Sequence, residues 1–249
     1  MNKLVSIITP SFNSARFIEE CILSVISQTY KNWEMLIVDD CSQDNSVDII
    51  SKFSNNETRI RLFRLEKNVG PAEARNIAIR NASGKYIAFL DSDDMWCSNK
   101  LEDQLKFMKK NNVEFSFTTY QCVYENGNDM NKIIKAPNKM TYHSYLKNTI
   151  IGCLTVIIDK EKTGYFEMPN IKSSQDMALW LYLMKKGFTA YGLDINLAKY
   201  RIVSSSNTSN KLNAVKDVWK VYREIEKLSV LYSIWCWINY AYNAIIKRL

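Results

Sequence analysis

The sequence predicts an α/β fold, a doubly wound, mixed but mainly parallel sheet with a C-terminal helical extension. Short apolar runs alternate with segments of helical spacing between residues 4 and 95. This alternation is typical of parallel strands joined by right-handed helical crossovers. Two of the apolar runs end directly in acidic residues, which parallel strands would bring to one edge of the sheet.

The first half of the chain supplies the clearest elements. Pro10 is expected to close the first strand, because proline cannot donate a hydrogen bond to a strand ladder. Pro71 suits the first turn of a helix, and Gly84 follows the end of that helix. We expect strands at residues 4–9, 33–38, 60–65 and 86–90, and helices at residues 15–28, 45–54 and 71–82.

The second half is less regular. Ser173 to Asp176 precede a strongly patterned apolar helix that Gly187 ends. The other expected elements are helices at 98–110, 212–227 and 228–246, strands at 113–124 and 155–158, and a polar excursion over 125–139. No linker is recognisable before about residue 205, so we expect one domain over residues 1–205, with halves 1–95 and 96–205, and an extension over 206–249.

Composition narrows the class of protein. The chain has 249 residues and a net charge of +7, and eight Lys and Arg residues follow Tyr200 against three acidic ones. These charges are not interleaved with aromatic residues along one groove, so we expect no nucleic-acid binding and a tail that seeks an anionic surface. The six cysteines include no CxxC pair and no signal peptide precedes Val5, which favours a reducing cytoplasm. His143 is the only histidine, and we expect it to be structural.

The segment from Tyr86 to Asp94 carries the strongest chemical signal. It is a short apolar run that stops in three closely spaced carboxylates, Asp91, Asp93 and Asp94. Their charges repel one another unless a cation or hydrogen-bond donors neutralise them. Carboxylate oxygens suit Mg²⁺ or Mn²⁺ that already holds a phosphate. The alternative is a solvated turn in which Ser92 or Asp94 caps the next helix.

A second acidic strand end favours the site. Asp39 and Asp40 follow the strand at residues 33–38. Because parallel strands share one carboxyl edge, this pair, the loop after Pro10 and the turn at Asp91 would lie together. One acidic turn is commonplace, whereas two on the same sheet edge indicate a ligand site.

Several motifs resemble glycosyltransferase family 2. They stand in the family's order and at its spacings: Val5-Ser6-Ile7-Ile8-Thr9-Pro10-Ser11-Phe12-Asn13, Ser27-Gln28-Thr29-Tyr30, Ile37-Val38-Asp39-Asp40-Cys41-Ser42, Asn68-Val69-Gly70 with Ala74-Arg75-Asn76, and Phe89-Leu90-Asp91-Ser92-Asp93-Asp94. Together they span residues 4–95 and are specific as a set. The resemblance implies a GT-A fold, with residues 1–95 as the half that binds a nucleoside diphosphate sugar and residues 96–205 as the acceptor half.

The family pattern assigns roles to residues of the first acidic edge. Thr9, Pro10, Ser11 and Phe12 would contact the nucleobase, and Asp40 would accept a hydrogen bond from a base N–H. The alternative for Asp40 is a turn-initiating residue whose carboxylate bonds to nearby backbone.

The family pattern also assigns roles around the diphosphate. Arg75 would lie near the nucleotide or pyrophosphate, where a forked cation has obvious use, although it could equally be a surface arginine. Asp91 and Ser92 would lie at the nucleotide sugar, with Asp91 facing the ribose. Asp93 would hold the cation, Mn²⁺ or Mg²⁺, that bridges the diphosphate, and Asp94 would cap a helix or support the metal site.

The acceptor side matches more loosely. The family's Glu-Asp pair before a tryptophan-containing helix appears as Gln175-Asp176, with Trp180 four residues on. The resemblance makes Asp176 the general base that takes the proton from the acceptor hydroxyl. Gln175, Trp180 and Arg201 would lie on the acceptor side, with Arg201 near the diphosphate. The alternative for Asp176 is an ordinary first-turn acid favoured by the helix dipole.

The uncharged segment over residues 228–246 is predicted to lie on a membrane rather than to cross it. On a helical wheel its Ser and Asn residues gather on one arc, and an apolar face flanked by tryptophans lies opposite. Such a helix suits the headgroup region, and the basic residues of 212–227 would meet anionic lipid. The alternative is that the apolar face packs on the domain.

These features predict an inverting, metal-dependent hexosyltransferase that uses a nucleotide sugar, with UDP favoured by the resemblance. By analogy with the family, the acceptor would be a saccharide on an isoprenoid diphosphate lipid, as in O-antigen or capsule synthesis. The protein would lie in the cytoplasm, peripheral on the inner face of the cell membrane. One alternative is an inactive sugar-nucleotide-binding module at the membrane. Another is a nucleotidyltransferase, although the few scattered glycines do not form its phosphate loop.

Overall fold

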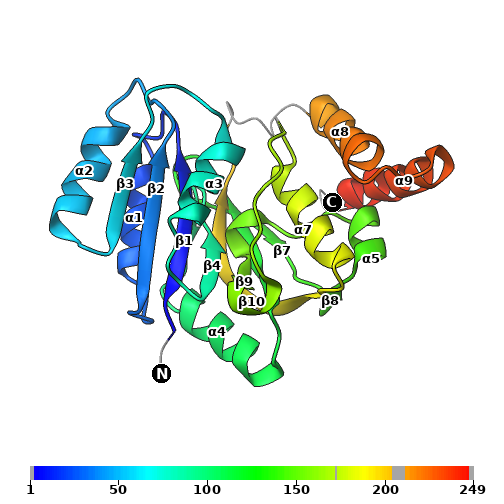
Figure 1. The fold of residues 1–249 in the computed structure, drawn as a ribbon, viewed down its shortest axis with the longest axis horizontal. Coiled ribbons are helices and arrows are strands. Elements are labelled where there is room, and N and C mark those ends of the chain that lie inside the picture. Colours follow the sequence, from blue (N-terminus) through cyan, green and yellow to red (C-terminus); the bar gives the residue numbers. More distant parts are fainter. Residues whose placement is uncertain (1–2, 172, 204–210, 247–249) are drawn as a thin grey trace.

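The computed structural model describes residues 3–171, 173–203 and 211–246 (Figure 1). Its first half contains the parallel strands β1 (Val5–Ser11), β2 (Trp33–Asp39), β3 (Ile60–Arg64) and β4 (Tyr86–Phe89). The helices α1 (Ile18–Ile26), α2 (Ser46–Asn56) and α3 (Pro71–Arg80) connect these strands. The predicted βαβ arrangement of the first half is therefore confirmed.

The second half adds shorter strands and further helices. Its strands are β5 (Met95–Trp96), β6 (Phe115–Val123), β7 (Asp129–Ile134), β8 (Lys139–Met140), β9 (Ile157–Asp159) and β10 (Ala190–Arg201). Its helices are α4 (Lys100–Asn111), α5 (Tyr142–Lys147), α6 (Lys160–Thr163), α7 (Gln175–Lys185), α8 (Lys211–Lys220) and α9 (Val230–Ile246), with a 3₁₀ turn η1 (Cys153–Thr155) and a π-helical turn η2 (Val221–Ile225).

All of these strands join one sheet. Its order is β3-β2-β1-β4-β9-β6-β10-β5, with β7 paired to β6 and β8 paired to β10. Strand β9 runs antiparallel to both β4 and β6, so β4, β6 and β10 point the same way. The carboxyl ends of β1, β2, β4, β6 and β10 therefore meet at one edge of a mixed, mainly parallel sheet, as predicted.

Helices cover both faces of the sheet. Within β1, Ile8 packs in one apolar cluster with α3 and α7, whereas Val5 and Ile7 pack in a second cluster with α1 and α4. Neighbouring residues of a strand point to opposite faces, so both faces of β1 are buried. This is the packing expected of a doubly wound sheet.

Several strands differ from the prediction, and the short strands β5 and β8 were not predicted. Strand β1 continues through Pro10, because β4 pairs with β1 only as far as Ile8 and Pro10 has a partner strand on one side alone. Strand β7 lies within the predicted polar excursion and forms a hairpin with β6. No apolar run marks β10, since Gly192 and Asp194 interrupt it, and the strand forms by pairing along β6.

Helix α3 also ends earlier than predicted. Its last residue is Arg80, and Gly84 serves the sheet instead of the helix end. A Cβ at Gly84 would lie only 2.6 Å from Ser6 Oγ and 2.7 Å from the Ser6 backbone nitrogen. The absent side chain therefore lets the chain enter β4 directly beside β1.

The side of α9 that meets the protein carries Ser233, Cys236 and Asn243, with Tyr232 and Tyr240 packed beside them. Ser233 and Cys236 are fully buried, and Asn243 Nδ2 donates to the carbonyl oxygen of Lys147 in α5 at 3.1 Å. In contrast, Leu231 is 82% exposed and Trp235 is 55% exposed. The alternative in which α9 packs its apolar face on the domain is therefore wrong. Among the helices that the structure describes, none is long and apolar enough to span a bilayer.

Candidate active site

The acidic turn at the end of β4 lies at the carboxyl edge of the sheet. The backbone nitrogen of Leu90 donates to Ile8 O at 3.1 Å, which ties the strand end to β1. The Asp94 backbone nitrogen then donates to Asp91 O at 3.1 Å and closes a tight turn. This turn therefore holds Asp91, Asp93 and Asp94 directly after β4, next to β1.

Asp91 is paired with Arg75. Arg75 Nη2 contacts Asp91 Oδ1 at 2.5 Å, and the arginine is buried while the aspartate is partly exposed. Arg75 Nε is buried and has no hydrogen-bond partner within the described part of the chain. Helix α3 thus holds a forked cation against the acidic turn with one donor still to be satisfied. This placement excludes the alternative that Arg75 is a surface arginine.

The other two carboxylates, Asp93 and Asp94, both have raised pKa values. Burial, followed by the charge of Asp91, raises the pKa of Asp93 to about 6. Burial also raises the pKa of Asp94 well above its usual range, and the charges of Asp93 and Asp91 add to that effect. The raised pKa values show that nearby positive charge does not fully compensate these acids. A bound cation would supply that charge.

The chemistry of this turn fits a hard divalent cation. Its donors are carboxylate oxygens, which Mg²⁺ and Mn²⁺ prefer. Across the described ranges, no group of three Asp, Glu, His or Cys side chains is arranged to hold a metal by itself.

Arg201 holds the acidic turn in place. Its backbone nitrogen donates to Asp94 Oδ1 at 2.8 Å, and its Nε donates to the Asp93 carbonyl oxygen at 2.8 Å. Its Nη2 donates to Glu20 Oε2 at 2.6 Å, and its Nη1 donates to Glu125 O at 2.7 Å. The side chain is only 1% exposed. Protein acceptors therefore occupy the Arg201 guanidinium beside Asp93, and its predicted place near the diphosphate stays a prediction.

Asp176, from the second half of the chain, is buried and experiences the charges of Arg75 and Asp91. It lies in the first turn of α7, two residues after Ser174, whose φ of 59° and ψ of 28° are left-handed. Burial raises the pKa of Asp176, its own first-turn backbone hydrogen bonds lower it, and the charges of Arg75 and Asp91 also act on it. The charges of Arg75 and Asp91 therefore act on the Asp176 carboxylate, and its role as the general base stays a prediction.

Asn76 fixes the loop that leads to Asp176, and no pattern in the sequence predicts this role. Its Nδ2 donates to Met168 O at 2.9 Å, and its Oδ1 accepts from Met168 N at 2.8 Å. Asn76 follows Arg75 on α3. One helix therefore places the Arg75 guanidinium and also holds the loop at Met168 that leads to Asp176. The Asn76 side chain and its Met168 partner are both buried. Only the fold brings these two positions together.

The residues predicted to contact the nucleobase are mostly enclosed. Thr9, Pro10 and Ser11 are buried within β1, whereas Phe12 is half exposed at the edge. The expected open turn is therefore the end of a strand. Asp40 is buried, and its two carboxylate oxygens accept from the backbone nitrogens of Val69 and Gly70 at 2.7 and 2.9 Å. The base contacts of these residues stay predictions.

The two remaining residues predicted for the acceptor side, Trp180 and Gln175, lie in different surroundings. Trp180 is fully buried between Phe89 and Phe115, with ring centroids 5.4 Å from each. The prediction that Trp180 faces the acceptor is therefore wrong, because the side chain fills the core under β4. Gln175 is mostly buried, and its Nε2 donates to Ile171 O at 3.0 Å in the loop before α7.

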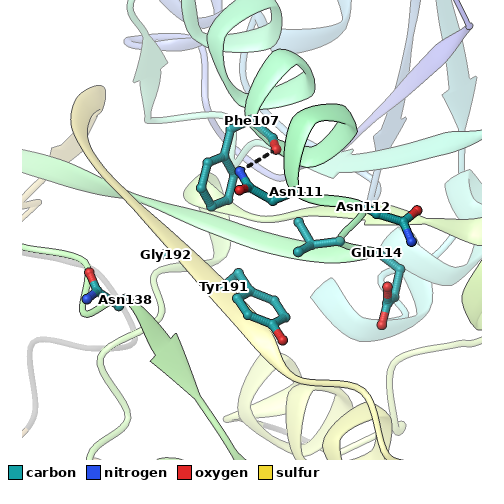
Figure 2. A pocket seen from close by; sticks show the side chains of 8 residues that line it. Phe107, Asn111, Asn112, Glu114, Asn138, Tyr191 and Gly192 are labelled. Carbon is teal, nitrogen blue, oxygen red and sulfur yellow. Dashed lines mark hydrogen bonds between the residues drawn. The ribbon is translucent and has the colours of Figure 1, made fainter.

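A cavity lies at the opposite edge of the sheet from the acidic turn. It has a volume of about 500 Å³ and is lined at the amino ends of β6 and β10 by residues that include Asn112, Asn138 and Tyr191 (Figure 2). Parallel strands place amino and carboxyl ends at opposite edges, so this cavity is separate from the acidic turn.

Comparison with known proteins agrees with this geometry. The family model described as "Glycosyl transferase family 2" matches residues 6–166. The "Putative teichuronic acid biosynthesis glycosyltransferase TuaG" of Bacillus subtilis (strain 168) is 52% identical over 99% of this chain and 98% of its own. The chain belongs to glycosyl transferase family 2.

Other members of glycosyl transferase family 2 resemble the chain along its whole length. The "UDP-Glc:alpha-D-GlcNAc-diphosphoundecaprenol beta-1,3-glucosyltransferase WfgD" of Escherichia coli is 41% identical over 98% of this chain and 95% of its own. The protein is therefore a glycosyltransferase, as predicted.

Solved structures share the fold. Staphylococcus aureus TarS 1–349 in complex with UDP-GlcNAc has a TM-score of 0.73 at 23% identity, over 88% of this chain and 64% of that one. The mannosyltransferase PcManGT from Pyrobaculum calidifontis, in complex with GDP-Man and Mn²⁺, has a TM-score of 0.71 at 16% identity, over 98% of this chain and 74% of that one. The predicted GT-A fold is thereby confirmed.

Proposed function

We propose that this protein is an inverting, metal-dependent transferase. It moves a hexose from a UDP-sugar to a hydroxyl of a saccharide carried on an isoprenoid diphosphate lipid. The observation that supports the proposal is the buried Asp176 carboxylate, on which the charges of the Arg75–Asp91 pair act, since a binding module has no need of a base there. The names of relatives such as WfgD, which specify UDP-Glc and a diphosphoundecaprenol acceptor, support this choice of substrates.

The donor binds across the carboxyl edge of the sheet in this proposal. Phe12 offers its half-exposed ring to the base, and Asp40 holds the loop at Val69 and Gly70 by accepting from their backbone nitrogens. Asp91 faces the ribose, and Arg75 turns its unsatisfied Nε toward the diphosphate oxygens. A divalent cation on Asp93, when bound, supplies positive charge to the departing diphosphate.

Asp176 takes the proton from the acceptor hydroxyl. Its buried carboxylate has a raised pKa, which makes it a stronger base than an exposed aspartate. The hydroxyl oxygen then attacks the anomeric carbon from the face opposite the leaving diphosphate, so the configuration inverts. Arg201 keeps the Asp93 backbone in place by its bond to the carbonyl oxygen.

The acceptor requires the protein to work at the membrane surface. The exposed apolar face of α9, with Leu231 and Trp235, supplies a surface that lies in the headgroup region. We therefore place the protein in the cytoplasm, peripheral on the inner face of the cell membrane. The boundaries of the donor half, the acceptor half and the C-terminal extension stay as predicted from the sequence.

The substitution Asp176→Asn tests the catalytic assignment. We expect donor affinity, measured by calorimetry with UDP-sugar and Mn²⁺, to change by less than about twofold, while sugar transfer falls by about 10²–10⁴-fold. Asp103→Asn is the matched control, because Asp103 is also a first-turn aspartate, on α4. Equal loss of binding and transfer in the Asp176 variant would make the residue structural.

A panel of nucleotide sugars tests the reaction itself. Wild-type protein with Mn²⁺ and a lipid diphosphate saccharide is expected to release UDP from at least one UDP-hexose. Binding of nucleotide sugars without any transfer would instead indicate the inactive module.

A further inference from the structure

A cleft lies between helices α8 and α9, outside the catalytic edge. It has a volume of about 610 Å³, and its walls are formed mainly by Trp219, Ile234, Trp237 and Ile238. Lys216, Lys220 and Glu224 complete its lining. Figure 1 shows α8 and α9 together at the end of the molecule remote from α2, beside α5 and α7.

The lining of the cleft suits an apolar chain with an anionic end. Two indoles and two branched side chains give up unfavourable contact with water when a hydrocarbon covers them. Ile234 and Ile238 are 41% and 52% exposed, so the described protein leaves them uncovered. Lys216 and Lys220 are exposed one turn apart on α8 and outnumber Glu224, which leaves positive charge at the rim for a phosphate.

The cleft is fixed relative to the base. Val218, Tyr222 and Cys236 from the C-terminal helices share one apolar cluster with Met177 and other residues of α7. Lys185 at the end of α7 also pairs with Glu226 at 3.1 Å. Because α7 carries Asp176 in its first turn, a ligand in the cleft would be held at a constant position from the reacting hydroxyl.

We propose that this cleft binds the first isoprenoid units of the lipid-linked acceptor, with Lys216 and Lys220 facing its phosphate end. The inference rests on the proposed function for the identity of the acceptor. A bilayer phospholipid would meet the open face of α9, whereas a walled cleft between two helices selects one chain. The lipid is thereby a recognised part of the substrate, and the cleft positions the saccharide for Asp176.

Tryptophan fluorescence tests occupancy directly, since Trp219 and Trp237 line the cleft. Full-length protein in detergent micelles is titrated with undecaprenyl phosphate or with phosphatidylglycerol. We expect a saturable spectral change with undecaprenyl phosphate and at least about tenfold weaker response to phosphatidylglycerol. Equal response to both lipids would overturn the proposal in favour of an ordinary phospholipid site.

The variants Ile238→Glu and Leu231→Glu separate the cleft from the general apolar face. Both residues are exposed on α9 two helical turns apart, but only Ile238 lines the cleft. We expect Ile238→Glu to weaken undecaprenyl phosphate binding by about tenfold and Leu231→Glu by less than twofold. The same loss in both variants would overturn the proposal.

The assay of transfer gives a second, independent measure. The ratio of kcat/KM for a long-chain acceptor to that for a short-alkyl acceptor with the same diphosphosaccharide is expected to fall about tenfold in Ile238→Glu alone. Failure of wild-type protein to use either acceptor would refute the proposed function, while the fluorescence titration still reports on the cleft. A dimer in sedimentation that Ile238→Glu dissociates would identify the cleft as a subunit contact and overturn the proposal.

Discussion

The three carboxylates that follow β4 are stabilised by residues far away in the sequence. Arg201 bonds to the backbone of Asp93 and to the side chain of Asp94, and it reaches Glu20 on α1. Arg75 pairs with Asp91. These contacts hold the turn but leave Asp93 with a raised pKa, so part of the folding free energy is spent on keeping a charged site assembled.

The substitution Asp93→Asn should stabilise the metal-free protein while abolishing function. The pKa of Asp93 rises from about 4 in the unfolded chain to about 6 in the folded protein. The folded wild-type protein therefore loses stability as the pH rises through that interval. We expect the variant to gain about 1–2 kcal/mol at pH 7, after allowance for solvent screening, and to lose that advantage near pH 4. Urea unfolding in EDTA at the two pH values measures the difference.

A wild-type protein equally stable to the variant at pH 7 would show that the repulsion in the acidic turn is already relieved. Calorimetry should also show that Asp93→Asn loses Mn²⁺-dependent UDP affinity, as expected for a residue that holds the cation.

The position of a strand depends on how closely its backbone can approach neighbouring segments, as well as on the strand preference of its residues. β10 has no clear signal in its sequence, yet Gly192 lets it pass beside the segment that contains Pro137. A Cβ at Gly192 would lie 2.0 Å from the Pro137 carbonyl oxygen, which is backbone and cannot rotate away. Strand β10 ends in Arg201, which bonds to Asp93 and Asp94, so the position of the strand determines how the acidic turn is held.

Gly192→Ala should therefore destabilise the protein more than a glycine substitution that meets only side chains. We expect a loss of about 2–3 kcal/mol for Gly192→Ala, typical of overpacking in a core. Gly152→Ala is the matched control, because its nearest neighbours are the side chains of Leu154 and Tyr120 at 3.1 Å. Equal unfolding midpoints in urea would contradict this account of β10.

At the scale of the whole molecule, the C-terminal helices extend the core and present an unpaired apolar face. Cys236 of α9 and Tyr222 of η2 are fully buried in the cluster that includes α7. Removing α9 would uncover this cluster, so a truncated chain is a poor test of membrane contact. Surface substitutions on α9 leave the core intact and are the better test.

The double variant Leu231→Glu and Trp235→Glu should bind membranes at least about tenfold less than wild type, because each side chain loses favourable burial in the headgroup region. Flotation with phosphatidylglycerol vesicles measures the bound fraction. The double variant Ile133→Glu and Ile195→Glu adds the same charge at exposed apolar residues outside α9. Equal flotation of both variants would contradict a role for α9, and unchanged thermal midpoints would show that both remain folded.

Local pattern was sufficient to predict the βαβ half of the chain and the two acidic strand ends. Apolar periodicity and turn residues act over a few positions, so strands β1 to β4 and the turn at Asp91 could be derived without coordinates. The resemblance to a known family then directed attention to Asp176. Neither source predicted β7, β10 or the role of Asn76.

Those features depend on contacts between distant positions. Pairing with β6 forms β10, and Asn76 finds Met168 only after α3 has packed on the sheet. The side of α9 that meets the protein was likewise open in the sequence, because its polar and apolar faces could each find a partner. Packing chose the polar side, since Ser233 and Cys236 fit closely against the protein and Asn243 reaches the backbone of Lys147.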